Sequence, residues 1–363
     1  MPSRVSTTAD AAIIGGGPAG CAAGIRLALA GARVILLDRL SDIARKPGEI
    51  IDPSVRIPLA ELGLVDAFNA LNSLALAGNL SRWDNEVPVE SCGMFSPHGL
   101  GALIDRSNFE QMLRSAAIRV GVEVLHPTQQ LVAERNGSMW EIAGDFNPAM
   151  RLRVPLVIEA TGRSGGVIHR GKRRVTDRLI ALLVYGSTAP GIREQRLLIE
   201  ACEAGWWYAA PLPENRTVIA LMTDPDLVPS SLDRPAYIEH QLLRTSLIRM
   251  FASETIKQPR QVFGCGASSG IREQIHGDNW VFVGDAASTY DPLLGKGVPL
   301  ALTKGVAIAR LVSNTSDLPR ALRAYAEAEQ AAFADFVAEQ CRTYRRAAPR
   351  FCTPFWERRR KLP

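Results

Sequence analysis

The chain has 363 residues, a formal net charge of +5 and an apolar content of 47%, values typical of a soluble globular protein. A chain of this length can bury a large core and predicts two domains. No stretch of about 20 apolar residues occurs, so we expect no membrane span. Residues 1–10 lack the apolar stretch of a secretory signal.

The cysteines and the basic residues bear on location and partners. The six cysteines are scattered without a Cys-x-x-Cys pair, so we expect reduced thiols, a cytoplasmic location and no metal site. The charge excess is modest and accompanies no nucleic-acid-binding motif, so we expect no nucleic acid partner. Short basic runs, at residues 172–174, 345–346 and 358–361, are either solvated surface or a docking patch for an acidic partner.

The first predicted element is an apolar strand that leads into a glycine-rich turn and a helix. Residues 12–14 suit a buried parallel strand. Gly15 allows a tight turn, Gly17 lets a pyrophosphate approach the backbone, and Gly20 lets the helix pack closely on the strand. The helix, over about residues 20–30, points its N-terminal amides at the phosphates. The residues expected at a dinucleotide are therefore Gly15, Gly17, Pro18, Ala19 and Gly20.

A second strand, over residues 33–37, ends at Asp38. An acid at this place hydrogen-bonds a ribose hydroxyl, so we expect Asp38 and the adjacent Arg39 at the nucleotide. The loop that follows contains Lys46-Pro-Gly-Glu49 and can fold over a cofactor. Lys46 is either a cofactor contact or a surface lysine, and Glu49 is either a site carboxylate or a surface acid.

The next segment combines a loop-rich stretch with a helix. Residues 78–101 alternate polar and apolar residues between turn signals, which predicts an excursion into a second sheet. His98 in this stretch is either an acid–base group near a cavity or a surface histidine. Asp105 is a suitable N-cap for the following helix. Arg106, in the first turn of that helix, can reach the adenosine side of a nucleotide.

Two further elements are predicted in the middle of the chain. An apolar strand over residues 154–160 ends at Thr161 and Gly162, which we place at the nucleotide. A continuous helix is predicted over about residues 235–253. The segment between them contains several short runs typical of strands, separated by turn signals.

The most unusual of these runs is Gly205-Trp206-Trp207-Tyr208. Side chains alternate between the faces of a strand, so Trp206 and Tyr208 share one face and Trp207 takes the other. One face then lines a cavity that accepts an aromatic group. The alternative is a strand that is buried on both faces.

A second glycine-bearing segment lies far downstream. Asp285 follows the apolar strand over residues 280–283, at the edge of the sheet where ligands bind, and either holds a ribityl hydroxyl or caps the next turn. Pro292 shapes a loop that leads to the start of an apolar helix, whose amides can stabilise negative charge on a reduced flavin. The residues expected at the flavin are Asp285, Gly295, Lys296, Gly297 and Val298.

Together the two glycine-bearing segments predict FAD rather than a nucleotide alone. The expected fold is α/β, with a Rossmann-like FAD-binding domain of the GR2 type, an interleaved substrate domain built on a mixed β-sheet, and a C-terminal helical tail. The predicted FAD-binding domain comprises residues 1–77, 102–170 and 265–317. The predicted substrate domain comprises residues 78–101 and 171–264, and the C-terminal helical region comprises residues 318–363.

The order of the motifs resembles that of flavin-dependent monooxygenases related to p-hydroxybenzoate hydroxylase, in the branch that is similar to tryptophan halogenases. The motifs are Gly-x-Gly-x-x-Gly, Asp-Arg-x-x-Phe, Ala-Thr-Gly-Arg, Gly-Trp-Trp-Tyr-x-x-Pro-Leu-Pro, Gly-Asp-Ala-Ala-Ser and Asp-Pro-x-x-x-x-Gly. Within that branch the chain most resembles the LodB-like flavoproteins that mature cysteine tryptophylquinone enzymes. The loop at Gly48-Glu49 and the tail Pro-Phe-Trp-Glu-Arg-Arg at residues 354–359 share this resemblance.

The resemblance implies hydroxylation of an indole-like or tryptophan-like substrate through a flavin C4a-hydroperoxide, with O2 as co-substrate. The substrate is a small aromatic molecule or a tryptophan of a precursor protein. Only one nucleotide fingerprint is present, so electrons come from transiently bound NAD(P)H or from a separate flavin reductase. The residues expected to take part in catalysis are Glu49, His98, Trp206, Tyr208 and Pro292.

Three different functions stay open beside this one. A flavin-dependent halogenase is disfavoured because Tyr208 and Ala210 replace the tryptophan and isoleucine of the halogenase motif, and residues 74–83 contain no lysine. A reductase of prenyl chains, similar to geranylgeranyl reductases, would need a long apolar tunnel. A non-catalytic flavoprotein chaperone would bind a partner's precursor without reducing its flavin.

Overall fold

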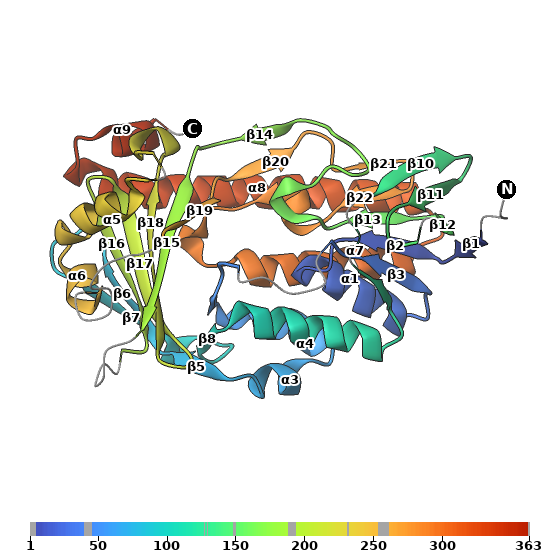
Figure 1. The fold of residues 1–363 in the computed structure, drawn as a ribbon, viewed down its shortest axis with the longest axis horizontal. Coiled ribbons are helices and arrows are strands. Elements are labelled where there is room, and N and C mark those ends of the chain that lie inside the picture. Colours follow the sequence, from blue (N-terminus) through green and yellow to red (C-terminus); the bar gives the residue numbers. More distant parts are fainter. Residues whose placement is uncertain are drawn as a thin grey trace.

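The computed structural model describes residues 5–39, 46–126, 128, 130–147, 150–187, 194–230, 232–252 and 261–361. Its two largest sheets lie at opposite ends of an elongated molecule (Figure 1). The long helix α8 (Leu318–Ala347) runs between them, because its first half packs on the core of one end and its second half on the core of the other.

A six-stranded sheet forms the end of the molecule near the N-terminus. Its order is β21-β22-β13-β2-β3-β9, and only the edge strand β21 runs antiparallel to its neighbour. The strands are β2 (Ala11–Ile14), β3 (Val34–Leu37), β9 (Glu123–Leu125), β13 (Val157–Glu159), β21 (His276–Gly277) and β22 (Trp280–Phe282). The four central strands are fully buried and apolar except for Glu159 at the end of β13, as expected for the centre of a parallel sheet.

Three helices pack around this sheet, namely α1 (Pro18–Leu29), α4 (Arg106–Arg119) and α7 (Gly297–Ser313). A Cβ atom on Gly305 of α7 would lie 2.3 Å from the carbonyl oxygen of Ala19, so α7 and α1 approach each other closely. This contact brings together two segments that lie far apart in the sequence. The two glycine-bearing loops, each at the start of one of these helices, therefore face the same region (Figure 1).

A mixed seven-stranded sheet forms the other end of the molecule. Its order is β19-β15-β18-β17-β16-β6-β7, with β6 and β16 parallel and all other neighbours antiparallel. The strands are β6 (Gly78–Arg82), β7 (Val89–Cys92), β15 (Ile180–Ser187), β16 (Arg196–Cys202), β17 (Gly205–Leu212), β18 (Arg216–Thr223) and β19 (Phe263–Gly266). The pairing of β6 with β16 confirms the predicted excursion of residues 78–101 into a second sheet.

The remaining elements form three smaller sheets and short helices. The small-sheet strands are β1 (Val5–Thr8), β4 (Ile50–Ile51), β5 (Ser73–Leu76), β8 (Gly101–Ile104), β10 (Val132–Asn136), β11 (Met139–Ala143), β12 (Met150–Val154), β14 (Arg173–Val175), β20 (Gly270–Arg272) and β23 (Ser288–Thr289). The short helices are α2 (Arg56–Glu61), α3 (Val65–Asn69) and α9 (Pro354–Arg360). Strands β8 and β19 run across the predicted boundaries at residues 101/102 and 264/265, and the domain boundaries stay a prediction.

The prediction of one helix over residues 235–253 was wrong. The chain forms α5 (Arg234–Leu243) and α6 (Leu247–Ala252), separated by a turn. The buried carboxylate of Glu200, on β16, accepts hydrogen bonds from the backbone N–H groups of Ser246 and Ile248. A neighbouring strand thus satisfies the first amides of α6, which ends the helical register before it.

Among the described residues, no helix is long and apolar enough to cross a membrane.

Candidate functional site

The first glycine loop is tight on one side and open on the other. Gly15 has a φ of +110°, and a Cβ atom there would lie 2.3 Å from the carbonyl oxygen of Ala160. A Cβ atom on Gly20 would lie 1.9 Å from the carbonyl oxygen of Gly15, so only glycine fits either position. A Cβ atom on Gly17 would meet nothing within 4 Å. Pro18 and Ala19 begin α1, whose N-terminal end therefore faces open space beside Gly17.

The second glycine loop repeats this arrangement. Gly284 has a φ of +63°, and its Cβ atom would lie 2.7 Å from the Cβ atom of Ala19. By contrast, a Cβ atom on Gly295 or Gly297 would meet no other atom within 4 Å. Lys296 is exposed beside them, and Val298 is buried in the first turn of α7. The two loops therefore touch where Gly284 meets Ala19. Gly17, Gly295 and Gly297 stay uncovered, in the region that both loops face.

A third loop joins this region from the second strand. A Cβ atom on Gly48 would lie 3.9 Å from Cγ2 of Val298, so the loop that holds Glu49 touches the start of α7. Ile50 and Leu293 pack against the same apolar cluster of the seven-stranded sheet, which contains Tyr208. The open surface is thus bordered by both glycine loops on one side and by the seven-stranded sheet on the other.

The acid at the end of β3 is where the sequence placed it. Asp38 lies against the glycine loop, because a Cβ atom on Gly16 would lie 2.5 Å from its Oδ2 atom. Its carboxylate forms an ion pair with Arg114 of α4, a residue that sequence reasoning missed. Arg39 is exposed. The position of Asp38 suits a ribose hydroxyl at the edge of the loop.

Lys46 and Arg106 meet at one carboxylate, that of Glu110 on α4. The Nζ atom of Lys46 lies 2.8 Å from Oε2 of Glu110, and Nη2 of Arg106 lies 3.0 Å from Oε1. Glu110 is buried, whereas the side chain of Lys46 is 39% exposed. The three side chains hold the loop of Gly48 and Glu49 against α4.

The turn at Thr161 and Gly162 is held by a buried acid. Glu159, at the end of β13, is fully buried and accepts hydrogen bonds from the backbone N–H groups of Gly166, Val167 and Ile168. The hydroxyl of Thr161 donates to the same carboxylate over 2.7 Å. Burial of this charge is offset by four donors, so its role is to shape the turn.

Asp285 lies beside a pocket lined by arginines. Its Oδ2 atom is 3.5 Å from Nε of Arg163, and its side chain is 37% exposed. The pocket has a volume of about 520 Å³ and is lined by Arg163, Gly165, Gly166, Arg170, Gly171, Arg173 and Arg272. Burial and the neighbouring Arg272 lower the pKa of Arg173 to about 10. Such a concentration of positive charge favours an anionic ligand.

An acidic and aromatic group lies where the loop of Glu49 meets the seven-stranded sheet. Glu49 is 3% exposed, so its interpretation as a surface acid was wrong. Its carboxylate accepts a hydrogen bond from the hydroxyl of Tyr185 over 2.5 Å and another from the backbone N–H of Gly48 over 2.9 Å. Burial, followed by the nearby Glu49, raises the pKa of Tyr208 well above its usual value. Cys265 of β19 packs against the same cluster.

The strand of the three aromatics is buried on both faces, which is one of the two arrangements that the sequence left open. Trp206 and Tyr208 pack in one apolar cluster and Trp207 in another, as the alternation predicts. The indole N–H of Trp206 donates to the hydroxyl of Tyr344, on α8. Pro292 is half-buried and begins a short turn that leads to Gly295.

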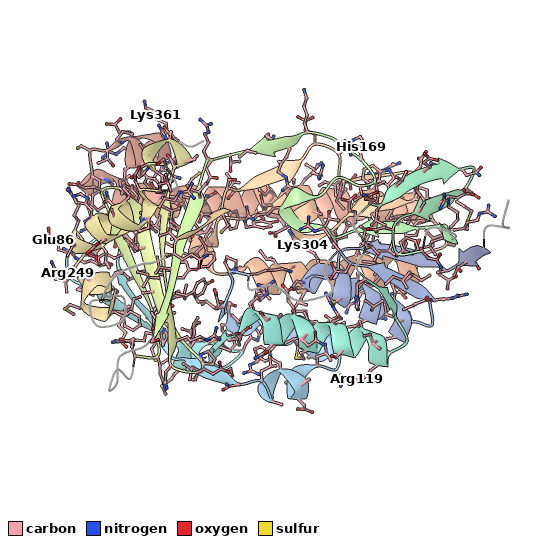
Figure 2. The ribbon with its side chains drawn as sticks, viewed as in Figure 1. Glu86, Arg119, His169, Arg249, Lys304 and Lys361 are labelled. Carbon is pink, nitrogen blue, oxygen red and sulfur yellow. The ribbon has the colours of Figure 1, made fainter. Side chains whose placement is uncertain are left out.

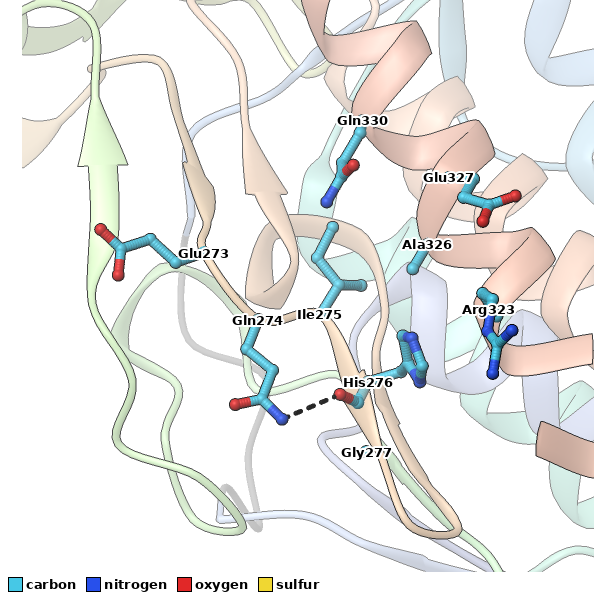
Figure 3. Close-up of a pocket in the computed structure, with 9 residues that line it drawn as sticks. All are labelled: Glu273, Gln274, Ile275, His276, Gly277, Arg323, Ala326, Glu327 and Gln330. Carbon is cyan, nitrogen blue, oxygen red and sulfur yellow. Dashed lines mark hydrogen bonds between the residues drawn. The ribbon is translucent and has the colours of Figure 1, made fainter. Parts of the chain in front are cut away.

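Two further places carry less chemistry. His98 is exposed in a turn after β7, where its backbone N–H donates to Ser96. A groove of about 500 Å³ lies between residues 273–277 and α8 (Figure 3). Burial and Arg323 lower the pKa of His276 in that groove. No residue of either glycine loop lines it, so we assign it no part in the site.

Comparison with known proteins identifies the family. The FAD binding domain family matches residues 8–337. The chain belongs to this family. Its sequence is 27% identical over 360 residues to the FAD-dependent oxidoreductase LodB of Marinomonas mediterranea, in a match that covers 96% of both chains. The protein is therefore an FAD-dependent oxidoreductase, and the resemblance seen in the motifs is confirmed.

Two solved structures share the fold. The myxobacterial chondrochloren halogenase CndH has a TM-score of 0.86 at 21% identity and covers 97% of this chain and 86% of its own. QhpG, a peptidyl tryptophan dihydroxylase essential for tryptophylquinone cofactor biogenesis, has a TM-score of 0.80 at 22% identity. The match covers 98% of this chain and 80% of QhpG. These likenesses confirm the expected α/β fold with its FAD-binding part, mixed sheet and C-terminal helices.

The open glycine surfaces fit FAD. Gly17, Gly295 and Gly297 leave free the space that side chains would fill, while Asp38 and Asp285 lie at its borders. Sequence reasoning missed Glu159 and Tyr185 in this region. Glu159 carried a signal, since it is an acid inside an apolar strand. Tyr185 carried none, because it meets Glu49 from a strand that is distant in the sequence.

Proposed function

We propose that this protein is an FAD-dependent monooxygenase that hydroxylates an indole-like aromatic group, and that this group is a tryptophan side chain of a partner protein. The observation that supports it most is the buried pair of Glu49 and Tyr185, beside Tyr208 on the side of the sheet that faces the glycine loops. Similarity to LodB over nearly the whole length, and the fold shared with a peptidyl tryptophan dihydroxylase, support the substrate class.

The chain offers a complete set of groups for FAD. The first turn of α1 would hold the pyrophosphate, Asp38 a ribose hydroxyl, Asp285 a ribityl hydroxyl, and residues 295–298 the flavin ring. When bound and reduced, FAD supplies the activation of O2. The packed loop of Gly48 and Glu49 would keep bulk water from the reacting edge.

Glu49 and Tyr185 are suited to move a proton. An aromatic carbon that gains an oxygen atom must lose its hydrogen as a proton, and a buried carboxylate within reach can accept it. Glu49 keeps one hydrogen bond from the backbone of Gly48 while its other oxygen faces Tyr185, so the phenol hydroxyl can orient the carboxylate or pass the proton on.

The arginine pocket supports NAD(P)H as the electron donor, in preference to a separate reductase. It lies beside Asp285, and four arginines line it. Diphosphates are recognised by such clusters. We propose that the phosphates of NAD(P)H bind there transiently. Replacement of Arg170, an exposed member of the cluster, should raise the KM for NAD(P)H about tenfold and leave FAD binding unchanged.

The decisive experiment uses the purified chain with FAD, NADPH and O2. A tryptophan-containing peptide and free tryptophan are supplied in parallel, with and without bromide. We expect the peptide to gain the mass of oxygen, measured by mass spectrometry, without dependence on halide. A brominated product would establish a halogenase and overturn the proposal.

A prenyl reductase or a flavoprotein chaperone would give a different outcome in the same assay. A prenyl reductase would oxidise NADPH with an isoprenoid substrate and leave the peptide unchanged. A chaperone would bind the peptide equally well whether its FAD is oxidised or reduced, and it would give no product. Failure of the chain to take up FAD at all would remove the basis of every one of these functions.

A further inference from the structure

The loop beside the expected flavin ring contains a buried carboxylate whose partners lie on α8. Asp291 lies immediately before Pro292, is 2% exposed, and accepts a hydrogen bond from the backbone N–H of Leu293. Its other oxygen, Oδ2, accepts from the hydroxyl of Tyr344 over 2.7 Å and from Nε2 of Gln340 over 2.8 Å. Both donors come from α8. The turn that leads to Gly295 is thus held by two side chains of α8.

The same tyrosine receives a hydrogen bond from the substrate side. The indole N–H of Trp206, on β17, donates to the hydroxyl of Tyr344 over 2.9 Å. Both side chains are buried, at 1% and 0% exposure. Trp206, Tyr344 and Asp291 therefore form a chain of two hydrogen bonds that joins the seven-stranded sheet to the loop after β23.

A second contact of α8 reaches the other end of this loop. Lys304 of α7 donates to the hydroxyls of Ser288 and Tyr290 over 2.9 and 2.6 Å, and it pairs with Glu329 of α8. Lys304 lies between the two helices (Figure 2). The segment from Ser288 to Asp291 is consequently hydrogen-bonded to α8 at both ends. The helix has little freedom to shift without moving the segment.

We propose that Trp206 and Tyr344 are positioning residues for the flavin loop, and that they set the affinity for FAD by holding Asp291 in place. Trp206 was expected from the sequence to line the substrate cavity. Its indole N–H instead points to the C-terminal helix, and Tyr208 is the member of the strand that lies near Glu49. This inference rests on the proposed binding of FAD to the glycine loops.

The hydroxyl of Tyr344 matters because it donates a hydrogen bond to a buried carboxylate. Asp291 is buried, and burial raises its pKa, so the charged form depends on the donors that reach it. The hydroxyl of Tyr344 supplies one of three donors to this carboxylate. Without it the carboxylate keeps Gln340 on one oxygen and Leu293 on the other. The loop then loses its link to the sheet while the fold keeps its packing.

The test is an FAD titration of the purified chain, followed by flavin fluorescence, for the wild type, Y344F, W206F and the double variant. Each single variant should raise the Kd for FAD about tenfold. The double variant should bind no more weakly than the weaker single variant, because both remove links of one chain. Thermal unfolding of each variant shows that it is folded. If W206F does not fold, Y344F, which removes one oxygen atom, still carries the test.

Trp207 provides the matched control. It is the next residue on β17 and is fully buried on the opposite face, where it packs in a different apolar cluster from Trp206 and Tyr344. W207F should lower thermal stability and leave the Kd for FAD within about twofold. Wild-type affinity in Y344F, or strictly additive losses in the double variant, would overturn the inference. A wild-type chain that binds no FAD would instead overturn the proposed function itself.

Discussion

The two faces of the seven-stranded sheet are both buried, but they are held in different ways. The face toward the flavin region carries polar atoms with specific partners, such as Trp206 with Tyr344 and Tyr185 with Glu49. The opposite face packs on α5 and α6 mainly through apolar side chains, among them Trp207 and Ile248, and the carboxylate of Glu200 is the polar group that receives the start of α6. Trp206 and Trp207 are adjacent in the sequence, yet only the first is linked by a hydrogen bond to another part of the site.

This difference separates stability from function. Apolar packing is non-directional, so the face toward α5 and α6 contributes mainly to the free energy of unfolding. Hydrogen bonds fix distances and angles, so the other face transmits position to the loops around it. Substitutions on the two faces should therefore change different measured quantities, and four predictions test this.

The largest effect should come from removal of a large side chain on the apolar face. Trp207→Ala should lower the free energy of unfolding by about 4 kcal/mol, because it leaves a cavity in a fully buried cluster. Denaturant unfolding followed by circular dichroism measures this loss. The Kd for FAD of the folded protein should stay unchanged. A large loss of FAD affinity here would show that the two faces are not separate.

The polar face should respond in turnover. Glu49→Gln removes the proton acceptor without change of shape and should reduce kcat about 100-fold at unchanged FAD affinity. Steady-state kinetics with the peptide substrate measures this. Glu90→Gln, which alters an acid with a 58% exposed side chain on β7, serves as the control and should leave kcat unchanged. Equal rates for E49Q and the wild type would remove Glu49 from the reaction.

The buried acids that contact α8, beside the polar face, should also make stability depend on pH. Burial and the nearby Asp291 raise the pKa of Asp177 from 3.8 to about 6. The native state then holds the proton more tightly than the unfolded chain, so stability falls as the pH rises from about 4 to about 6 and is constant above that window. The expected decrease is about 3 kcal/mol.

Unfolding by urea at a series of pH values measures this dependence. Asp177→Asn should flatten it, while Asp278→Asn, at a residue with an 82% exposed side chain, should preserve it. The groups that face Asp177 and Asp291 include the charged Arg359 from α9 and the neutral Tyr344 and Cys341 from α8. A pH dependence that survives in D177N would assign the proton to Asp291, the other buried carboxyl group of the pair.

The smallest effect should come from His98. It is exposed in a turn, so His98→Ala should change the free energy of unfolding by less than about 0.5 kcal/mol and leave kcat unchanged. A pH–rate profile of the variant measures the effect on kcat. Loss of one limb of that profile would restore His98 as an acid–base group.

Local patterns in the sequence were sufficient for the flavin-binding half. The order of apolar strand, glycines, helix and acid at residues 12–38 predicts its own geometry, because each step depends on neighbours within a few residues. The same holds for Asp105, whose side chain caps α4 as expected. It does not hold for residues 235–253, where a carboxylate from β16 divides the expected helix.

Only the tertiary structure decided the remainder of the site. Glu49 meets Tyr185, Lys46 meets Glu110, and Trp206 meets Tyr344 across distances in the chain that no local pattern spans. The sequence alone determined the FAD-binding family and predicted the turns at the cofactor, because glycine conformation and strand periodicity are local properties. The partners of the buried polar groups depended on how the sheets and α8 pack, since a buried donor or acceptor is satisfied by whichever element the fold brings to it.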